Sequence, residues 1–204
     1  MKRMIALTLA ALLVMGTFAA CTKGGETDVT TTVPTTEAVK LDANIILSSI
    51  WGKFTENELF PVTGGAPETY GEMIEQDENY TMPDAPANYD MKYAESLSTY
   101  LCIPADQLAN IDEVSYAQHA MMINNFACGV VHVTSDAKTF ADAVHEAIAN
   151  NMWFCGQPEK LLIAVIGDEH VLISYGLEVA LNPVATHLAE VYPDAQVLYN
   201  EAIG

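Results

Sequence analysis

Two apolar segments on either side of a tight turn constrain the fold of this chain more than any other feature. Residues 161–166 and 171–175 consist mainly of aliphatic side chains, and the pair Gly167-Asp168 lies close after the first of them. Such an arrangement is typical of a β-hairpin. The first segment is apolar at every position, which indicates a strand with both faces buried. The sequence therefore predicts a hairpin whose first strand is the central strand of a sheet.

A second pair of strands precedes a helix in the middle of the chain. The pattern predicts strands over residues 114–122 and 126–134, joined across the asparagine pair at 124–125. Ser135 or Asp136 then caps a helix that has one apolar face. The residues of that face are Ala137, Phe140, Ala141, Val144, Ala147, Ile148 and Met152.

Further elements extend this pattern towards both ends of the chain. Residues 43–54 and 93–100 are predicted to be helical. Asn182 followed by Pro183 is typical of an N-cap and a first helical residue, and a last strand is predicted at residues 197–199. The order β-β-α-β-β-α-β, preceded by helical and loop segments, predicts an α+β fold. In this fold the helices pack on one face of an antiparallel sheet.

Prolines and glycines interrupt any regular pattern between residues 55 and 90. We predict mostly loop there, with one short helical turn at residues 70–76. The acidic residues 77–84 lack the Asp-x-Asp-x-Asp-Gly order of a calcium loop. The chain also lacks Cys-x-x-Cys and His-x-His spacing, so neither a metal nor a cofactor is predicted.

The start of the chain has the organisation of a bacterial lipoprotein signal. Two basic residues precede an apolar stretch that is too short and too early to favour a membrane span, and small residues lead to Cys21. This segment resembles the lipobox, in which a diacylglycerol is attached to the cysteine and the chain is cut before it. We therefore predict a signal peptide over residues 1–20, a lipid-anchored flexible linker over residues 21–40 and a single α+β domain over residues 41–204.

Charge restricts the partners of the mature chain. Without residues 1–20 it has six lysines and no arginine against 27 acidic residues, a formal charge of −21. Arginine is the side chain best suited to phosphates and nucleic-acid grooves, so no nucleic-acid partner is predicted. The acidity would also repel an anionic bilayer. We therefore expect a protein held at the outer side of the cell membrane by its lipid alone.

Three cysteines remain besides the acylated one. Cys102, Cys128 and Cys155 are an odd number and cannot form a complete disulfide framework. A bridge between Cys128 and Cys155 and three separate small core residues are both compatible with the sequence.

Several short motifs occur in order between residues 100 and 194. They are Tyr-Leu-Cys-Ile from residue 100, Met-Met-Ile-Asn from residue 121, and Leu-Leu-Ile-Ala-Val-Ile before a Gly-Asp turn from residue 161. In this order the segment resembles a domain of unknown function found in small lipoproteins of Gram-positive anaerobes. The resemblance implies a location and a fold, and it carries no activity to this chain.

Two short motifs match catalytic patterns only in part. Ser135 and Lys138 have the Ser-x-x-Lys spacing of penicillin-binding proteins, but the Ser-Asp-Asn and Lys-Thr-Gly elements are absent. Capping of the following helix explains the same residues. His145 and Glu146 begin a His-Glu-x-x-His motif, but residue 149 is alanine. His145 is therefore predicted to be a half-exposed packing residue.

One further pair has the residue types of a reactive site. Cys128 and His132 are four residues apart on a predicted strand, so their side chains point to one side. The pair could be half of a metal site or a thiol–imidazole pair. No third ligand is evident from the sequence.

The best candidate for a binding surface follows the predicted central helix. Asn150, Asn151 and Trp153 offer two amides and an aromatic ring, which could hydrogen-bond and stack on a sugar or a peptide. Alternatively, Trp153 and Phe154 close the core while the asparagines end the helix.

These observations favour a membrane-anchored, extracytoplasmic lipoprotein that acts as a non-catalytic binding or interaction module. Its ligand would be an envelope protein, a glycan or a peptide. The alternative is a small cell-envelope hydrolase that uses Ser135 or Cys155. A solute-binding receptor is disfavoured by size, because such receptors usually need two lobes around a hinge.

The lipid anchor can be tested directly. We expect cells that express the wild-type chain to incorporate a fatty-acid probe into it, and cells that express Cys21→Ala to leave the chain unlabelled. Labelling followed by gel fluorescence measures this difference. Equal labelling of the two proteins would contradict the prediction.

Overall fold

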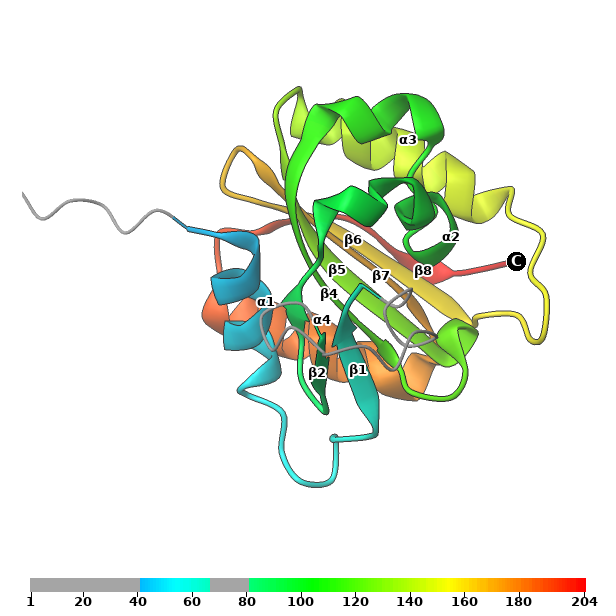
Figure 1. The fold of residues 1–204 in the computed structure, drawn as a ribbon. Helices are drawn as coiled ribbons and strands as arrows, with labels where there is room; N and C mark the ends of the chain where they lie inside the picture. The colour runs from blue at the N-terminus through cyan, green and yellow to red at the C-terminus, as the bar shows by residue number, and fades with distance from the viewer. Residues whose placement is uncertain (1–40, 67–80) are drawn as a thin grey trace, which may run out of the picture. The chain divides into compact units, whose positions relative to one another are not determined.

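An antiparallel sheet of eight strands is the centre of the computed structural model, which describes residues 41–66 and 81–204 (Figure 1). The strands are hydrogen-bonded in the order β2-β1-β4-β5-β7-β6-β8, and β3 pairs with β4 outside this order. The described residues lie within one compact unit. The strands are β1 (Val62–Gly65), β2 (Thr81–Pro83), β3 (Ala87–Asn88), β4 (Ile111–His119), β5 (Phe126–Val133), β6 (Lys160–Ile166), β7 (His170–Gly176) and β8 (Gln196–Ala202).

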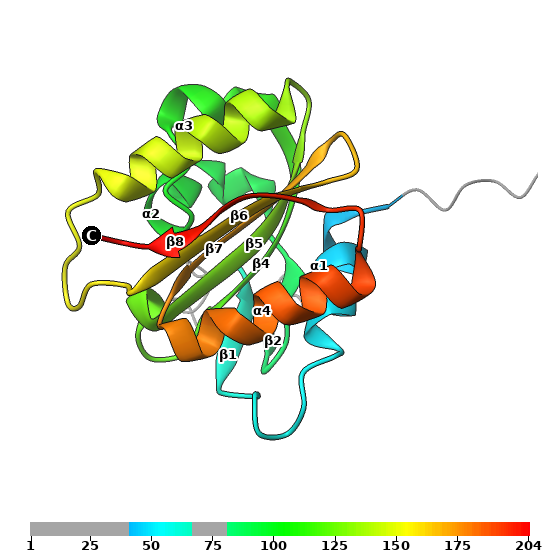
Figure 2. The same ribbon diagram turned by 180° about the vertical axis from the view of Figure 1, so that it is seen from behind.

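Helices cover both faces of this sheet. Figures 1 and 2 show α2 and α3 over one face and α1 and α4 over the other. The α-helices are α1 (Ala43–Trp51), α2 (Leu97–Tyr100), α3 (Ala137–Ala149) and α4 (Glu178–Val191). Short 3-10 helices are η2 (Met91–Ser96), η3 (Ala105–Asn110) and η4 (Ile123–Asn125). The α+β class and the order of elements from β4 to β8 are confirmed, whereas the prediction of helices on one face is wrong.

The reason is visible in β6. Its residues Leu161, Ile163 and Val165 belong to the core under α3, whereas Leu162, Ala164 and Ile166 belong to the core under α1 and α4. Successive side chains of a strand point to opposite faces. A strand that is apolar at every position therefore needs a cover on each side, which a single helical layer cannot provide.

The position of β6 in the sheet also differs from the prediction. β6 lies between β7 and the edge strand β8, and β5 occupies the middle of the seven-strand order. Seven of the eight residues of β5 are buried. Burial on both faces shows that a strand is not exposed on either side of the sheet. Several strands share this property, so the sequence does not show which of them is the central one.

The middle of the chain follows the prediction closely. β4 and β5 are joined through η4, and the β6–β7 hairpin turns at residues 167–169. The Asp136 carboxylate caps α3 by accepting the backbone N–H of Thr139 at 2.7 Å. Met152 is not part of the apolar face, because α3 ends at Ala149 and Met152 is 77% exposed.

The start of α4 is a second correction. α4 begins at Glu178 rather than at Pro183, which lies inside the helix. Asn182 is therefore not a cap; its side-chain oxygen accepts a hydrogen bond from Lys160 Nζ at 2.9 Å. Pro183 has no N–H, so the carbonyl of Val179 lacks the donor that a regular helix would provide.

Parts of the predicted organisation lie outside the described residues. These are the signal peptide, Cys21 and the linker, the helical turn at residues 70–76, and residues 77–80 of the acidic segment. Within residues 41–66 and 81–204, no helix has the length and apolar content needed to cross a membrane.

The two-sided core gives a mutational prediction. Ile163 is fully buried and faces Ile173 and Tyr199 on the neighbouring strands. Ile163→Asp would bury an unpaired charge, a cost comparable to the roughly 5–15 kcal/mol by which domains are stable. We expect circular dichroism to show no cooperative unfolding transition. Val197→Asp is the control, because Val197 on β8 is 50% exposed and should tolerate the charge. A folded Ile163→Asp protein would contradict this description of the core.

Candidate functional site

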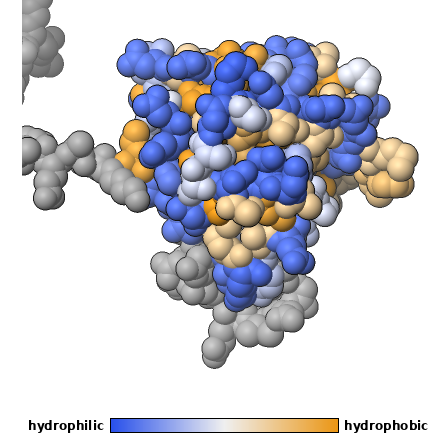
Figure 3. All heavy atoms as spheres, turned by 90° about the horizontal axis from the view of Figure 1, so that it is seen from above, coloured by the Kyte–Doolittle hydropathy of each residue, from blue (hydrophilic) through white to orange (hydrophobic). Residues whose placement is uncertain are grey.

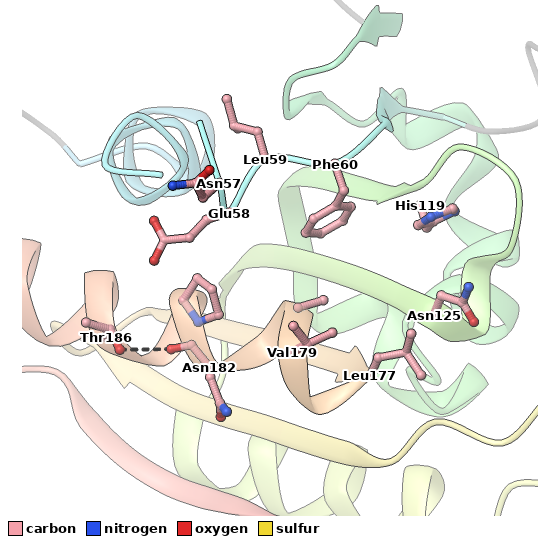
Figure 4. Close-up of a pocket in the computed structure, with 12 residues that line it drawn as sticks. Asn57, Glu58, Leu59, Phe60, His119, Asn125, Leu177, Val179, Asn182 and Thr186 are labelled. Carbon is pink, nitrogen blue, oxygen red and sulfur yellow. Dashed lines mark hydrogen bonds between the residues drawn. The ribbon is translucent and has the colours of Figure 1, made fainter. Parts of the chain in front are cut away.

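A groove of about 580 Å³ lies beside α4 on the α1 side of the sheet (Figure 4). One wall is formed by residues 57–60, which follow α1, and the other by the first turns of α4. His119 and Asn125 close one end. We call this the α4 groove, lined by Asn57, Glu58, Leu59, Phe60, His119, Asn125, Leu177, Val179, Ala180, Asn182, Pro183 and Thr186. Its volume is within the range of ordinary ligand sites.

Glu58 holds the first wall against α4. Its carboxylate accepts hydrogen bonds from the backbone N–H and the hydroxyl of Thr55, both at 2.8 Å. The buried His187 of α4 places Nε2 3.2 Å from the same carboxylate. The backbone N–H of Thr55, with its hydroxyl and His187, lowers the pKa of Glu58. Glu58 is therefore fixed as part of the wall and is not a free acid or base.

An aromatic cluster fixes the floor of the groove. The ring of Phe60 lies edge-to-face with Phe126 and with Trp51, at centroid distances of 4.9 and 5.8 Å. The imidazole of His119 stacks along Phe60 at 6.0 Å. These contacts connect the wall segment to β4 and β5 and hold Phe60 in place.

His119 presents a donor rather than an acceptor. Its Nδ1 accepts the backbone N–H groups of Met121 and Met122, at 3.2 and 3.3 Å. In the neutral imidazole, the proton is therefore on Nε2. Nε2–H is left to donate to a ligand.

The end of the groove depends on a close approach of two backbones. Gly176 has a φ of 152°, and a Cβ at this position would clash with the backbone of Asn125. The following residue, Leu177, donates its N–H to the Asn125 carbonyl at 2.9 Å. This contact places the start of α4 beside Asn125.

Several polar groups of the groove have no partner within the protein. Among the described residues, the side-chain amides of Asn57 and Asn125 make no hydrogen bond. The Val179 carbonyl lacks its helical donor because of Pro183. No lysine, arginine, serine or cysteine is among the lining residues in this part of the chain. The hydroxyl of Thr186 donates to the Asn182 carbonyl at 2.9 Å. Apart from the Glu58 carboxylate, the groove therefore offers neutral hydrogen-bonding groups and apolar surface.

In the candidate binding segment after α3, residues 150–154, the asparagine amides are engaged within the protein. The Asn150 amide donates to the Glu146 carbonyl at 2.8 Å, and the Asn151 amide is 3.7 Å from Cys102 Sγ. Trp153 is half-buried and packs on Tyr175 at 4.9 Å. Phe154 is 74% exposed, so the prediction that it closes the core is wrong. In Figure 3 an apolar protrusion lies at the edge where Figure 1 places this loop.

The partial catalytic motifs have structural roles. Ser135 is exposed, and Lys138 Nζ lies 3.0 Å from Asp142, one turn further along α3. His145 stacks on Tyr199 at 3.7 Å and places Nε2 2.7 Å from Glu201. His145 is thus the half-exposed packing residue that the sequence predicts.

Cys128 and His132 do not form a pair. Residues four apart on a strand are separated by about 13 Å, which is too far for direct contact. Burial raises the pKa of Cys128 to about 12, so its thiol stays protonated. His132 instead bonds to Asp112, which together with Glu169 raises the pKa of His132.

The other reactive side chains are also separate. Cys102, Cys128 and Cys155 are free. Cys102 and Cys128 are buried, as predicted for separate small core residues, whereas Cys155 is exposed and does not belong to the core. Burial raises the pKa of Cys102 to about 12. The described residues contain no group of three or more potential metal ligands.

Comparison of the chain with protein-family models, curated proteins and solved structures gives no match. The resemblance to the lipoprotein domain stays a prediction.

The α4 groove does not follow from the sequence pattern. Its two walls lie far apart in the chain; Glu58 and His187, which join them, are separated by 129 residues. The one local signal is Pro183 inside a helical pattern, which marks a helix with an irregular face.

Alanine substitutions at Trp153 and Phe154 test whether only the first of these two aromatic side chains packs against the core. Trp153→Ala should lower the free energy of unfolding by about 2–3 kcal/mol, less than the roughly 3–5 kcal/mol of a fully buried aromatic. Phe154→Ala is the matched control, with an expected change within about 0.5 kcal/mol. Urea denaturation measures both. Equal changes in the two variants would contradict the packing of Trp153 on Tyr175.

Proposed function

We propose that this protein is a lipid-anchored, extracytoplasmic binding module and that its ligand occupies the α4 groove. One observation carries the binding role. The groove gathers unpaired neutral hydrogen-bonding groups, Asn57, Asn125 and His119 Nε2–H, around apolar side chains in a volume suited to a ligand. Asn125 and His119 are half-buried and Asn57 is exposed. A ligand that covers these groups removes their water, so a ligand that hydrogen-bonds to them is favoured over one that leaves them unpaired.

The location rests on the start of the sequence. The basic residues, the apolar stretch and Cys21 support an acyl anchor, and residues 21–40 would act as a spacer between the bilayer and the domain. A domain held this way samples ligands near the membrane without inserting into it.

The chemistry supports binding rather than hydrolysis. Lys138 pairs with Asp142 and is not available to activate Ser135. Cys155 is exposed on a loop and the other two cysteines are buried. His119 Nδ1 accepts backbone N–H groups, and the imidazole of His187 lies against carboxylates. Among the described residues, neither imidazole makes a hydrogen bond to a hydroxyl or a thiol.

Protein-observed NMR with a library of small fragments tests the groove. We expect the shifts of residues 39–204 to gather at Leu59, Phe60 and Val179. Val179→Trp should abolish them, because Val179 is 77% exposed and a larger ring would fill the groove without disturbing the core. Val197→Trp, at a half-exposed site on β8, should leave them unchanged.

Two results would contradict the proposal. One is a set of fragment shifts that does not change in Val179→Trp. The other is a set that gathers at Asn150 and Trp153 instead, which would return the binding surface to the loop after α3.

A further inference from the structure

We infer that the ligand of the α4 groove is an extended polypeptide segment with apolar side chains and a neutral or positive charge. This inference rests on the proposed function and names the class of ligand. It depends on the hydrogen-bonding groups of the groove, on its apolar surface and on its charge.

The hydrogen-bonding groups match a peptide backbone. A polypeptide presents an N–H donor and a C=O acceptor at nearly every residue. Figure 4 shows Asn57 at one end of the groove and Asn125 with His119 at the other, with Val179 between them. The two amide side chains offer donors and acceptors, and His119 Nε2–H offers a further donor. These groups can pair with such a backbone. In other peptide-binding proteins, main-chain bonds give affinity and side-chain pockets give specificity.

The apolar surface favours side chains over sugar rings. Leu59, Leu177 and Val179 line the groove and provide aliphatic contacts. Phe60, the aromatic residue of the lining, is already in contact with three rings. Little of a flat aromatic face is left for a sugar to stack on. A hydroxyl-rich ligand would lose hydration against the aliphatic wall without compensation.

The loop next to the groove adds adaptable apolar surface. Met121 and Met122, which follow His119, are 86% and 42% exposed. Their backbone N–H groups are fixed by the His119 ring, whereas their side chains are free to rearrange. Flexible thioether side chains are typical of surfaces that bind varied peptides. An extended segment leaving the groove past His119 would meet them.

Charge selects among peptides. Glu58 is the charged side chain among the described lining residues, and no lysine or arginine accompanies it. The chain without residues 1–20 has a formal charge of −21. An acidic peptide would be repelled at a distance and would find no cationic partner in the groove, whereas basic residues flanking an apolar centre would be attracted.

A random-peptide phage library selected on residues 39–204 tests this inference, because that unit contains the sheet and both cores. Peptides enriched on the wild type should combine apolar residues with lysine or arginine and contain few acidic residues. Fluorescence polarisation should show affinity reduced about tenfold or more by Val179→Arg, as expected for a central contact. Val197→Arg, the matched control on β8, should retain the wild-type affinity.

The other outcomes overturn the inference in distinguishable ways. Three results would each reject an apolar peptide of neutral or positive charge as the ligand. They are enriched peptides that bind Val179→Arg as well as the wild type, enriched peptides that are acidic, and no enrichment at all. A glycan array tested in parallel separates the claim about the ligand class from the claim about the binding site. Glycan binding that is lost in Val179→Arg would reject a peptide as the ligand but would support the groove as the binding site. Absence of binding in both screens, together with fragment shifts insensitive to Val179→Trp, would reject the proposed function itself.

Discussion

Burial on both faces of the sheet is the constraint on which the rest of this structure depends. Every residue of β7 and six of the seven residues of β6 are buried. Strands of this kind need apolar cover on each side. α3 provides it on one side, and α1 with α4 provides it on the other. The groove is a consequence of the second cover, since it forms where the chain leaving α1 returns to the sheet alongside α4.

α4 serves both packing and the groove, and Ala180 takes part in each. Ala180, Leu181, Val184 and Leu188 have their side chains in the core shared with α1. Val179, Pro183 and Thr186 line the groove. Polar contacts join the chain that follows α1 to α4. Lys53 pairs with Glu190 at 2.7 Å, and His187 lies between Glu190 and Glu58. A helix that is required for folding thus also fixes the geometry of the proposed site.

Local patterns predict the elements of this fold better than their assembly. The β6–β7 hairpin follows from apolar segments around Gly167, and the start of α3 follows from the capping carboxylate of Asp136. Residues 161–166 are apolar at every position, which indicates that both faces of this strand are covered. Which elements cover each face depends on long-range packing, which the local pattern does not predict. Asn182 and Pro183 match a helix start, but α4 begins at Glu178, five residues before Pro183. The preceding residues, Gly176 and Leu177, are fixed by their close contact with the Asn125 backbone, which the local pattern does not reveal. The α4 groove joins segments separated by more than a hundred residues and has no sequence motif.

Occupancy of the groove on living cells tests the central claim most directly. A photo-reactive amino acid at position 179, in the full chain with Cys21 intact, should give a discrete crosslinked adduct that an excess of selected groove-binding peptide prevents. The same group at position 197, half-exposed on β8, should give no adduct that the peptide prevents. Equal crosslinking at the two positions, or an adduct at position 179 that the peptide does not reduce, would contradict a binding role for the α4 groove.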